Sequence, residues 1–277
     1  MTTSPFSPSL QLADGRAIPQ FGLGVYKVDD SLAAHLVEGA IEAGYRHVDT
    51  AKLYFNEAGV GAGIRASGVQ REEIFVTTKV WNDDQGYDET LRAFDTSLEL
   101  LGLDYVDLYL IHWPAPAQDR YVETWRALET LKGEGRARSI GVSNFNAPHL
   151  DKLLANATET PVINQIELQP WLQQHELRAY NAAHGILTEA WSPLARGRVL
   201  DDPTLAAIGE KHGKTPAQVV LRWHVQSGVA VIPKSNSLDR IRENSLIFDF
   251  ELDAADLAAI AALETGERTG SDPDTVG

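Results

Sequence analysis

The sequence predicts a (β/α)8 TIM barrel, an α/β fold in which eight parallel strands alternate with helices. Eight short β-rich runs alternate with longer amphipathic segments, and no low-complexity linker interrupts them. A doubly wound sheet usually ends at about five or six strands, so eight repeats favour the closed barrel. The length of 277 residues also fits, because such barrels commonly have about 250 residues in one domain. We therefore expect a single domain over residues 1–277.

The expected strands are runs rich in β-branched and aromatic residues. They cover residues 21–25, 46–49, 74–79, 106–111, 139–142, 162–167, 187–191 and 229–232. The helices between and after them are expected at residues 31–43, 57–67, 89–100, 121–132, 148–156, 174–184, 203–212, 215–226 and 238–246. Within the first helix, Leu32, Leu36 and Ala40 recur every fourth residue and so share one helical face.

The two ends of the chain lie outside these repeats. Near the start, residues 10–12 alternate, Asp14-Gly15 is a turn signal and Ala17-Ile18 begins a return strand. This pattern predicts a β-hairpin, which we expect to cap the barrel bottom. At the other end, residues 266–277 are rich in Gly, Thr, Ser and Asp and have no periodicity, so we expect a mobile loop.

Composition excludes several kinds of function. The net charge of −15 argues against a general nucleic-acid binder, which needs a basic face to displace counterions from phosphates. There are no cysteines, so disulfides, thiolate catalysis and cysteine metal sites are excluded. Residues 1–10 do not resemble a signal peptide, and no apolar run approaches the roughly 18 residues of a membrane span. We expect a soluble cytoplasmic protein.

Four ionisable residues lie at or just past the ends of three consecutive expected strands. Asp49, Lys79 and His112 end or follow the second, third and fourth strands, and Tyr54 lies one short loop beyond the second. In a (β/α)8 barrel, the loops after the strands carry the chemistry. Taken one at a time, Asp49 and Lys79 could be a structural ion pair, Tyr54 a packing residue and His112 a hydrogen-bonded core imidazole. Their joint placement favours a site, because burying them elsewhere would leave costly unsatisfied charges.

These residue types suit the protonation of an oxygen. The unperturbed pKa of a phenol is about 10, and an adjacent ammonium such as Lys79 stabilises the phenolate and so eases proton release from Tyr54. Asp49 would hold Lys79 protonated, and His112 would steer a carbonyl oxygen toward the phenol. The set contains no hydroxyl or thiol nucleophile of the usual kind. It therefore suits protonation of an oxygen while another group delivers hydride.

A second group of residues suits a phosphate and a flat ring. After the eighth strand, Lys234 and Arg240 flank the start of a helix that Asn236 or Ser237 could cap, and helix starts bind anions. A capped, solvated helix start is the alternative reading. The indole of Trp191 could stack on a heteroaromatic ring. Three polar side chains could bind a carboxamide: Ser143, Asn144 and Gln165. Alternatively, they form ordinary turns and a hydrogen-bonded core residue.

Three other patterns are discounted. The glycines of residues 59–63 fall inside an expected helix, so they indicate close helix packing rather than a dinucleotide loop. His47 and Asp49 lack a second histidine pair at ligand spacing, and no metal is expected. Glu167 and Glu189 could be imagined as a glycosidase pair, but each lies within a strand, where pairing with a neighbour is expected.

Taken together, the motifs resemble those of the aldo-keto reductases over nearly the whole chain, and are most similar to bacterial 2,5-diketo-D-gluconate reductases and related actinobacterial enzymes. The matching segments are residues 44–51 with Tyr54, Asn56 and Glu57, and residues 78–81, 107–114, 141–145 and 232–235. The resemblance implies NADPH lying across the carboxyl face of the barrel. It also implies a catalytic tetrad of Asp49, Tyr54, Lys79 and His112, in which Tyr54 is the general acid.

The resemblance also assigns contacts to the cofactor and the substrate. Trp191 would stack on the nicotinamide, and Ser143, Asn144 and Gln165 would bind its carboxamide. The pyrophosphate would be lined by Ser192, Leu194, Arg196 and Gly197. The 2′-phosphate would be bound by Lys234, Ser235, Asn236 and Arg240. The adenine would lie against Glu243 and Asn244. Gly24 and Val25 would border the nicotinamide, and Tyr26, Trp81 and Trp113 the substrate.

The implied activity is NADPH-dependent reduction of aldehydes and ketones, such as small dicarbonyls, keto-sugars or keto acids, by a monomer. Residues 113–120 and the tail are short compared with larger relatives, so we expect an open pocket. Arg196 and Arg198 could strengthen phosphate binding or favour an acidic substrate. Two alternative functions remain. One is an aldolase in which Lys79 forms a Schiff base with the substrate, and the other is a nucleotide-sensing barrel that binds NADPH but scarcely turns over.

Overall fold

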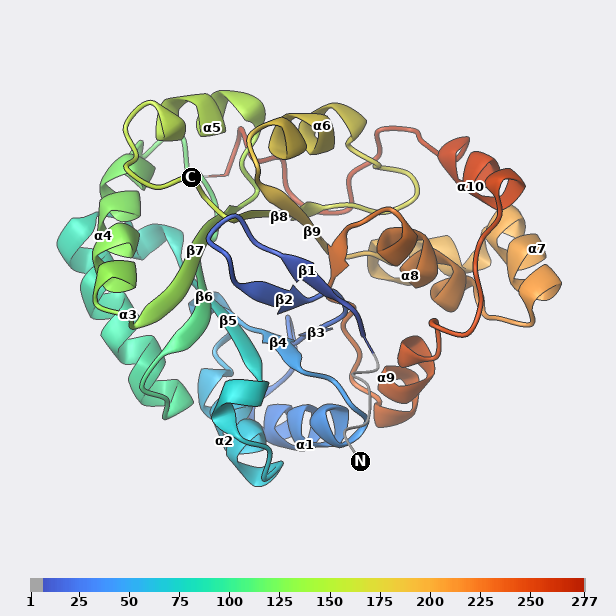
Figure 1. The fold of residues 1–277 in the computed structure, drawn as a ribbon, viewed down its shortest axis with the longest axis horizontal. Coiled ribbons are helices and arrows are strands. Elements are labelled where there is room, and N and C mark those ends of the chain that lie inside the picture. The colour runs from blue at the N-terminus through green and yellow to red at the C-terminus, as the bar shows by residue number, and fades with distance from the viewer. Residues whose placement is uncertain (1–6, 277) are drawn as a thin grey trace.

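The computed structural model describes residues 7–276 and contains the predicted barrel (Figure 1). Its eight parallel strands are hydrogen-bonded in chain order. They are β3 (Leu23–Gly24), β4 (His47–Asp49), β5 (Phe75–Val80), β6 (Val106–Ile111), β7 (Ala137–Ser143), β8 (Ile163–Glu167), β9 (Leu187–Trp191) and β10 (Ala230–Val231). Bridges from Phe21 to Val231 and from Gly24 to Lys234 join the two edge strands and close the barrel. The predicted fold class is therefore confirmed.

Ten α-helices lie around the strands in the described residues. They are α1 (Asp30–Glu42), α2 (Glu57–Ala66), α3 (Tyr87–Leu101), α4 (Tyr121–Gly133), α5 (Ala147–Leu154), α6 (His175–Ala183), α7 (Pro203–His212), α8 (Pro216–Gln226), α9 (Leu238–Ser245) and α10 (Ala254–Ala261). Short 3-10 helices occupy Lys52–Tyr54, Arg71–Glu73, Asn82–Asp84 and Ala195–Asp201. Helix α10 was not expected from the sequence. A capping box at its start could have predicted it: Asp253 accepts from the backbone N–H groups of Ala255 and Asp256.

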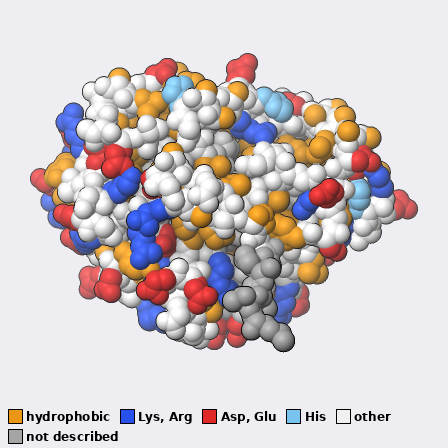
Figure 2. Space-filling model, viewed as in Figure 1, with side chains coloured by type: hydrophobic (Ala, Val, Ile, Leu, Met, Phe, Trp, Pro, Cys, Tyr) orange, Lys and Arg blue, Asp and Glu red, His pale blue; other side chains and the backbone are white. Residues whose placement is uncertain are grey.

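The hairpin predicted near the start is present and lies across one end of the barrel (Figure 1). Strands β1 (Ser9–Gln11) and β2 (Ala17–Pro19) pair antiparallel. Leu12 and Ile18 pack against Phe75, Leu108 and Ile163, which fill the barrel interior at this end. The hairpin thus closes the bottom with an apolar plug, while the opposite end stays open. On the hairpin face, the described acidic and basic side chains are interspersed (Figure 2).

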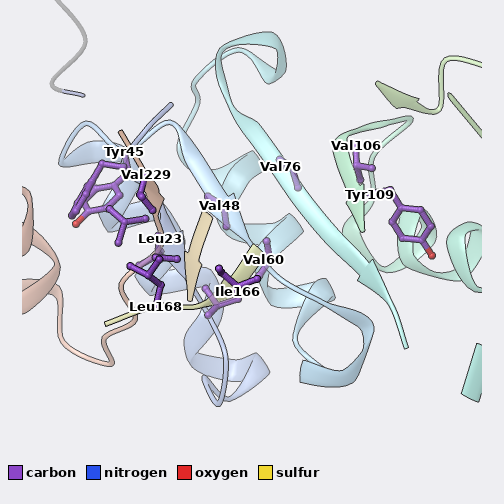
Figure 3. Packing of buried hydrophobic residues seen from close by; sticks show 14 of the residues in the cluster. Leu23, Tyr45, Val48, Val60, Val76, Val106, Tyr109, Ile166, Leu168 and Val229 are labelled. Carbon is purple, nitrogen blue, oxygen red and sulfur yellow. The ribbon is translucent and has the colours of Figure 1, made fainter. Parts of the chain in front are cut away.

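Alternation along the strands separates a packing face from an interior face. Val48, Val76 and Ile166 belong to the buried apolar cluster that the strands share with the helices (Figure 3). Because successive side chains of a strand point to opposite sides, their neighbours Asp49 and Gln165 face the barrel interior. The interior is therefore where polar strand residues from different parts of the chain meet.

The glycines of α2 allow it to pack closely on its neighbours, as the sequence predicted. A Cβ on Gly59 or Gly63 would overlap the backbone of α1, and a Cβ on Gly61 would overlap the backbone of Leu101. Small residues on a helix face let two backbones approach, so this segment is a packing surface and not a phosphate loop. Helices α1 and α2 accordingly lie side by side in Figure 1.

Replacing Gly61 with alanine should destabilise the fold. The added Cβ forces the backbone near Leu101 to move, and overpacking of this kind lowers the free energy of unfolding by about 1–3 kcal/mol. Urea unfolding followed by circular dichroism measures the change. Gly133→Ala in α4 is the matched control, since a Cβ there meets no atom within 4 Å and alanine is the better helix former. Equal stability of the two variants would contradict the packing role.

Candidate functional site

A cavity of about 860 Å³ opens at the carboxyl ends of the barrel strands. Nearly all the residues singled out from the sequence line it: Gly24, Tyr26, Asp49, Tyr54, Trp81, His112, Trp113, Ser143, Asn144, Gln165, Trp191, Ser192, Leu194, Arg196, Gly197, Lys234, Ser235, Asn236, Arg240, Glu243 and Asn244. Two others, Val25 and Lys79, are fully buried and do not line it. The cavity lies at the end of the barrel where enzymes of this fold carry out their chemistry.

Asp49 and Lys79 form a buried ion pair at the base of the cavity. The Lys79 Nζ donates to Asp49 Oδ1 at 2.6 Å and to the Thr50 carbonyl oxygen at 2.9 Å. Gln165 Nε2 donates to the other carboxylate oxygen, Oδ2, at 2.8 Å. Burial raises the pKa of Asp49, and the neighbouring Lys79 ammonium opposes that rise. Both oxygens of the carboxylate thus have partners, which a charge in this position requires.

Tyr54 is positioned by a tightly held loop. It ends the 3-10 helix Lys52–Tyr54, and Phe55 follows in the left-handed region with φ of 55°. Asn56 fixes this loop, because its Nδ2 donates to the carbonyl oxygens of Val25 and Val28, both at 2.9 Å. Such a conformation is strained for a bulky residue and needs this support. The phenol ring is consequently held at the cavity wall.

The ionisation of Tyr54 is governed by its burial. Lys79 Nζ lies 5.2 Å from the centroid of the phenol ring. Burial raises the pKa of Tyr54 well above its usual value, and the negative charge of Asp49 adds to the rise. That Lys79 eases proton release by stabilising the phenolate stays a prediction. The phenol keeps its proton throughout the neutral range.

His112 is a neutral imidazole at the same wall. Burial lowers its pKa well below the usual value, and the charge of Lys79 lowers it further. Its ring packs edge-on against Tyr54 at 5.7 Å and against Trp81 at 5.2 Å between centroids. Trp113 stacks on its other side at 6.5 Å. A neutral imidazole held in this way can donate one N–H to an oxygen in the cavity.

The amide side chains predicted to bind a carboxamide also organise the cavity wall. Asn144 Oδ1 accepts from the Trp191 indole Nε1 at 2.8 Å, and Asn144 Nδ2 donates to the carbonyl oxygen of His112 at 2.9 Å. Asn144 adopts a left-handed φ of 65°, which asparagine tolerates better than most residues. Trp191 is thereby fixed with an indole face available at the cavity, as stacking requires.

The cavity is also lined by four cations: Lys27, Arg196, Lys234 and Arg240. In the described part of the chain, none of these four has an acidic group within 4.0 Å. Partial burial and the nearby Lys27 lower the pKa of Lys234, so a bound anion would relieve an unfavourable arrangement. Ser237 caps α9 beside them, accepting from Arg240 N. The start of α9, with Lys234 before it and Arg240 in its first turn, therefore suits a phosphate.

The carboxyl-terminal tail crosses the cavity. It forms no helix or strand up to residue 276, as predicted, and hydrogen bonds attach it to the barrel. Glu167 Oε1 accepts from the backbone N and the hydroxyl of Thr269, both at 2.6 Å, and Oε2 accepts from Gly270 N at 2.9 Å. Gly270, Ser271 and Val276 then line the cavity. Residue 277 lies outside the described residues.

Other anchors hold both ends of this tail. Asp274 accepts from Asn146 Nδ2 at 2.8 Å, which places the end of the described chain beside α5 (Figure 1). Arg198 pairs with Glu267 at 2.5 Å and lies over the Trp171 ring. Arg198 therefore holds the tail, whereas Arg196 lines the cavity. The short tail thus lines part of the pocket, and the open pocket stays a prediction.

The cavity also includes residues that the sequence did not point to. Those not predicted are Lys27, Leu53, Pro193, Leu200, Thr215, Pro216, Ala217, Gly270, Ser271, Val276, Ile232 and Pro233. Lys27 could have been found, because it follows the first strand at the carboxyl face. The tail residues gave no local signal, since their position depends on Glu167, about a hundred residues earlier in the chain.

Two general features of residues 7–276 bear on the site. Within them, no three His, Asp or Glu side chains lie close enough together to hold a metal ion. Their helices also include none that combines the length and apolar character needed to cross a bilayer.

Comparisons with known proteins agree with this geometry. Residues 19–265 match the model of the Aldo/keto reductase family. Glyoxal reductase of Bacillus subtilis is 54% identical over 267 residues, covering 96% of each chain. Methylglyoxal reductase DkgA of Yersinia pestis is 52% identical over 272 residues, covering 98% of each chain. The solved structure of Gox0644 in its apo form has a TM-score of 0.94 at 50% identity, covering 98% of this chain and 99% of that one. A mutant of Gox0644 was solved in complex with NADPH.

Replacing Glu167 with alanine should release the tail. The variant loses the three hydrogen bonds to Thr269 and Gly270, so trypsin should cleave after the half-buried Arg268 at least several-fold faster. Mass spectrometry of timed samples measures the rate. Ser271→Ala is the control, because Ser271 lines the cavity without anchoring the tail. Identical cleavage rates for wild type and Glu167→Ala would show that Glu167 does not hold the tail.

Proposed function

Because the chain belongs to the aldo/keto reductase family, we propose that it reduces aldehydes and ketones to alcohols with NADPH. One observation carries the proposal. A protonated phenol, a neutral imidazole and a buried ion pair meet at a cavity that is also lined by four cations without acidic partners. The first group suits a carbonyl oxygen, and the second suits the phosphates of a dinucleotide.

The residues present fit NADPH. The 2′-phosphate would be held by Lys234, Ser235, Asn236 and Arg240. The pyrophosphate would be held by Ser192, Leu194, Arg196 and Gly197, and the adenine by Glu243 and Asn244. Trp191, Gln165, Ser143 and Asn144 would hold the nicotinamide, next to Gly24 and Val25. The unpaired cations support this assignment, because a chain of net charge −15 has an excess of acids with which they could have paired. When bound, NADPH supplies a hydride.

The protein's own residues then handle the proton and the substrate oxygen. Tyr54 Oη donates its proton to the carbonyl oxygen of the substrate, since burial keeps the phenol protonated until that moment. His112 donates an N–H to the same oxygen and orients it. The Lys79 ammonium stabilises the phenolate that results, and Asp49 keeps Lys79 in place. Aromatic walls from Tyr26, Trp81 and Trp113 exclude water around the reacting carbonyl.

Small dicarbonyls are the proposed substrates to test first. Two relatives about half identical to this chain are named for glyoxal and methylglyoxal. We also propose that the protein is a cytoplasmic monomer; light scattering on the purified protein measures its oligomeric state.

The aldolase alternative is disfavoured by the surroundings of Lys79. A Schiff-base lysine must lose its proton before it attacks a carbonyl. Here the Nζ donates to both Asp49 and the Thr50 carbonyl oxygen, so the ammonium is held in its charged form. Lys79 also does not line the cavity. Absence of borohydride-trapped substrate on Lys79 is the result expected from this geometry.

Tyr54→Phe should abolish turnover and spare cofactor binding. The variant keeps the ring but lacks the proton, so kcat should fall by about 10²–10⁴-fold, the range for a lost general acid. NADPH oxidation with methylglyoxal, followed at 340 nm, measures turnover, and fluorescence titration measures NADPH affinity. Near-normal turnover by the purified variant would refute the role of Tyr54. An inactive wild type that binds NADPH tightly would instead favour a nucleotide sensor.

Neutralising Lys234 and Arg240 together should weaken NADPH binding at least tenfold while changing NADH binding little. A tenfold loss corresponds to about 1.4 kcal/mol, which is modest for two charge-assisted hydrogen-bonding groups. Fluorescence titration with each cofactor measures the change. Arg242→Gln is the control on the same helix, because Arg242 does not line the cavity. Equal wild-type affinities for NADH and NADPH would contradict the assignment.

A further inference from the structure

Glu189 is a buried acid that the mechanism above does not use. It lies in the middle of β9, is 0% exposed, and is in register with Gln165 on β8. Its Oε2 accepts from Gln165 Nε2 at 2.7 Å, and the same nitrogen donates to Asp49 Oδ2 at 2.8 Å. One amide nitrogen therefore joins Glu189 to the catalytic pair across the barrel interior.

Glu189 has no cation of its own. Lys79 is hydrogen-bonded to Asp49, and Glu189 Oε1 has no hydrogen-bond partner among the described residues. Its nearest basic group is His47, with Nε2 at 3.8 Å, and burial lowers the pKa of His47 to about 3, so that ring is neutral. A second buried anion here would be uncompensated, which is strongly unfavourable. Burial, followed by the charge of Asp49, accordingly raises the pKa of Glu189 to about 8.

The shared nitrogen also fixes which way the Gln165 amide points. An amide NH₂ has two hydrogens, and here each is directed to a carboxyl oxygen. Turning the amide over would set its oxygen against the Asp49 carboxylate, which can only accept. Gln165 lines the cavity, so its carbonyl oxygen is the end left to accept a hydrogen bond there. A carboxamide NH₂ is a matching donor.

We propose that Glu189 is a positioning residue for this reaction: with Asp49 it orients the Gln165 amide toward the cofactor, and it does so as an uncharged carboxylic acid. The inference rests on the proposed function. It explains why an acid lies in the barrel interior with no base to pair with. It also leaves the Asp49–Lys79 pair as the charged pair nearest to the Tyr54 phenol in the described interior.

The uncharged state can be tested without the cofactor. The infrared spectrum of the wild-type protein at pH 7 should contain a C=O band of a protonated carboxylic acid that Glu189→Gln lacks. The band should disappear as the pH rises through about 8. Below that range the group carries its proton, and above it the group is ionised. Absence of the band at pH 7 would overturn the proposal, even if the enzyme is fully active.

The positioning role is tested by comparing two variants. Glu189→Leu fills the space but accepts no hydrogen bond, so its dissociation constant for NADPH should rise at least fivefold. Glu189→Gln keeps a carbonyl acceptor for Gln165 and should recover most of that loss. A merely structural role would give both variants similar affinity, whatever their melting temperatures, and would overturn the proposal.

The pH dependence of kcat distinguishes an effect of the charge of Glu189 from an effect of its packing. The groups that face Glu189 are His47 and Asp49 on β4, Lys79 on β5 and Tyr54 beyond β4, and ionised Glu189 raises the pKa of Tyr54. In alcohol oxidation Tyr54 must accept a proton, so the alkaline rise in kcat should shift to lower pH in Glu189→Gln. If the wild type oxidises alcohols and Glu189→Gln shows the same pH dependence of kcat, the inference about Glu189 is overturned and the proposed function is not. A wild type without carbonyl or alcohol activity would overturn the proposed function, and the infrared band would still decide the state of Glu189.

Discussion

The catalytic end of the barrel depends on the ion pair between Asp49 and Lys79. Both side chains are at most 2% exposed, and removing two charges from water costs several kcal/mol per ion unless hydrogen bonds compensate. The compensation is present, because Thr50 O accepts from Lys79 and Gln165 donates to Asp49. The result is a fixed positive charge beside Tyr54 in surroundings where water does not screen it.

Much of the fold and the site could be predicted because both follow from local patterns. Strand alternation and the carboxyl-end rule place Asp49, Lys79 and Trp191 on the interior side at the correct end of the barrel. The tail could not be predicted in this way. Its path depends on Glu167 meeting Thr269 over a separation of 102 residues, and no short-range periodicity encodes such a contact.

The acidity of Tyr54 shows a second limit of sequence reasoning. Spacing brings an ammonium near a phenol, but it does not give the strength of competing effects. In the structure, burial and then the Asp49 charge raise the pKa of Tyr54. We therefore propose that Lys79 acts in the transition state, because an ammonium acts more strongly on a forming phenolate than on a neutral phenol.

Polarity increases along the barrel axis, and this order has a physical cause. The bottom is filled by Leu12, Ile18 and Phe75, so an ion at that level would have neither water nor partners. Above them lie buried polar groups that include Glu189, where an acid survives by keeping its proton. The neighbouring charges of Asp49 and Lys79 are tolerated at the base of the cavity because they pair with each other and with several hydrogen-bonding groups. The hairpin thus contributes to catalysis from a distance: by sealing the bottom it keeps the interior dry, and dryness is what keeps Glu189 neutral and Tyr54 protonated.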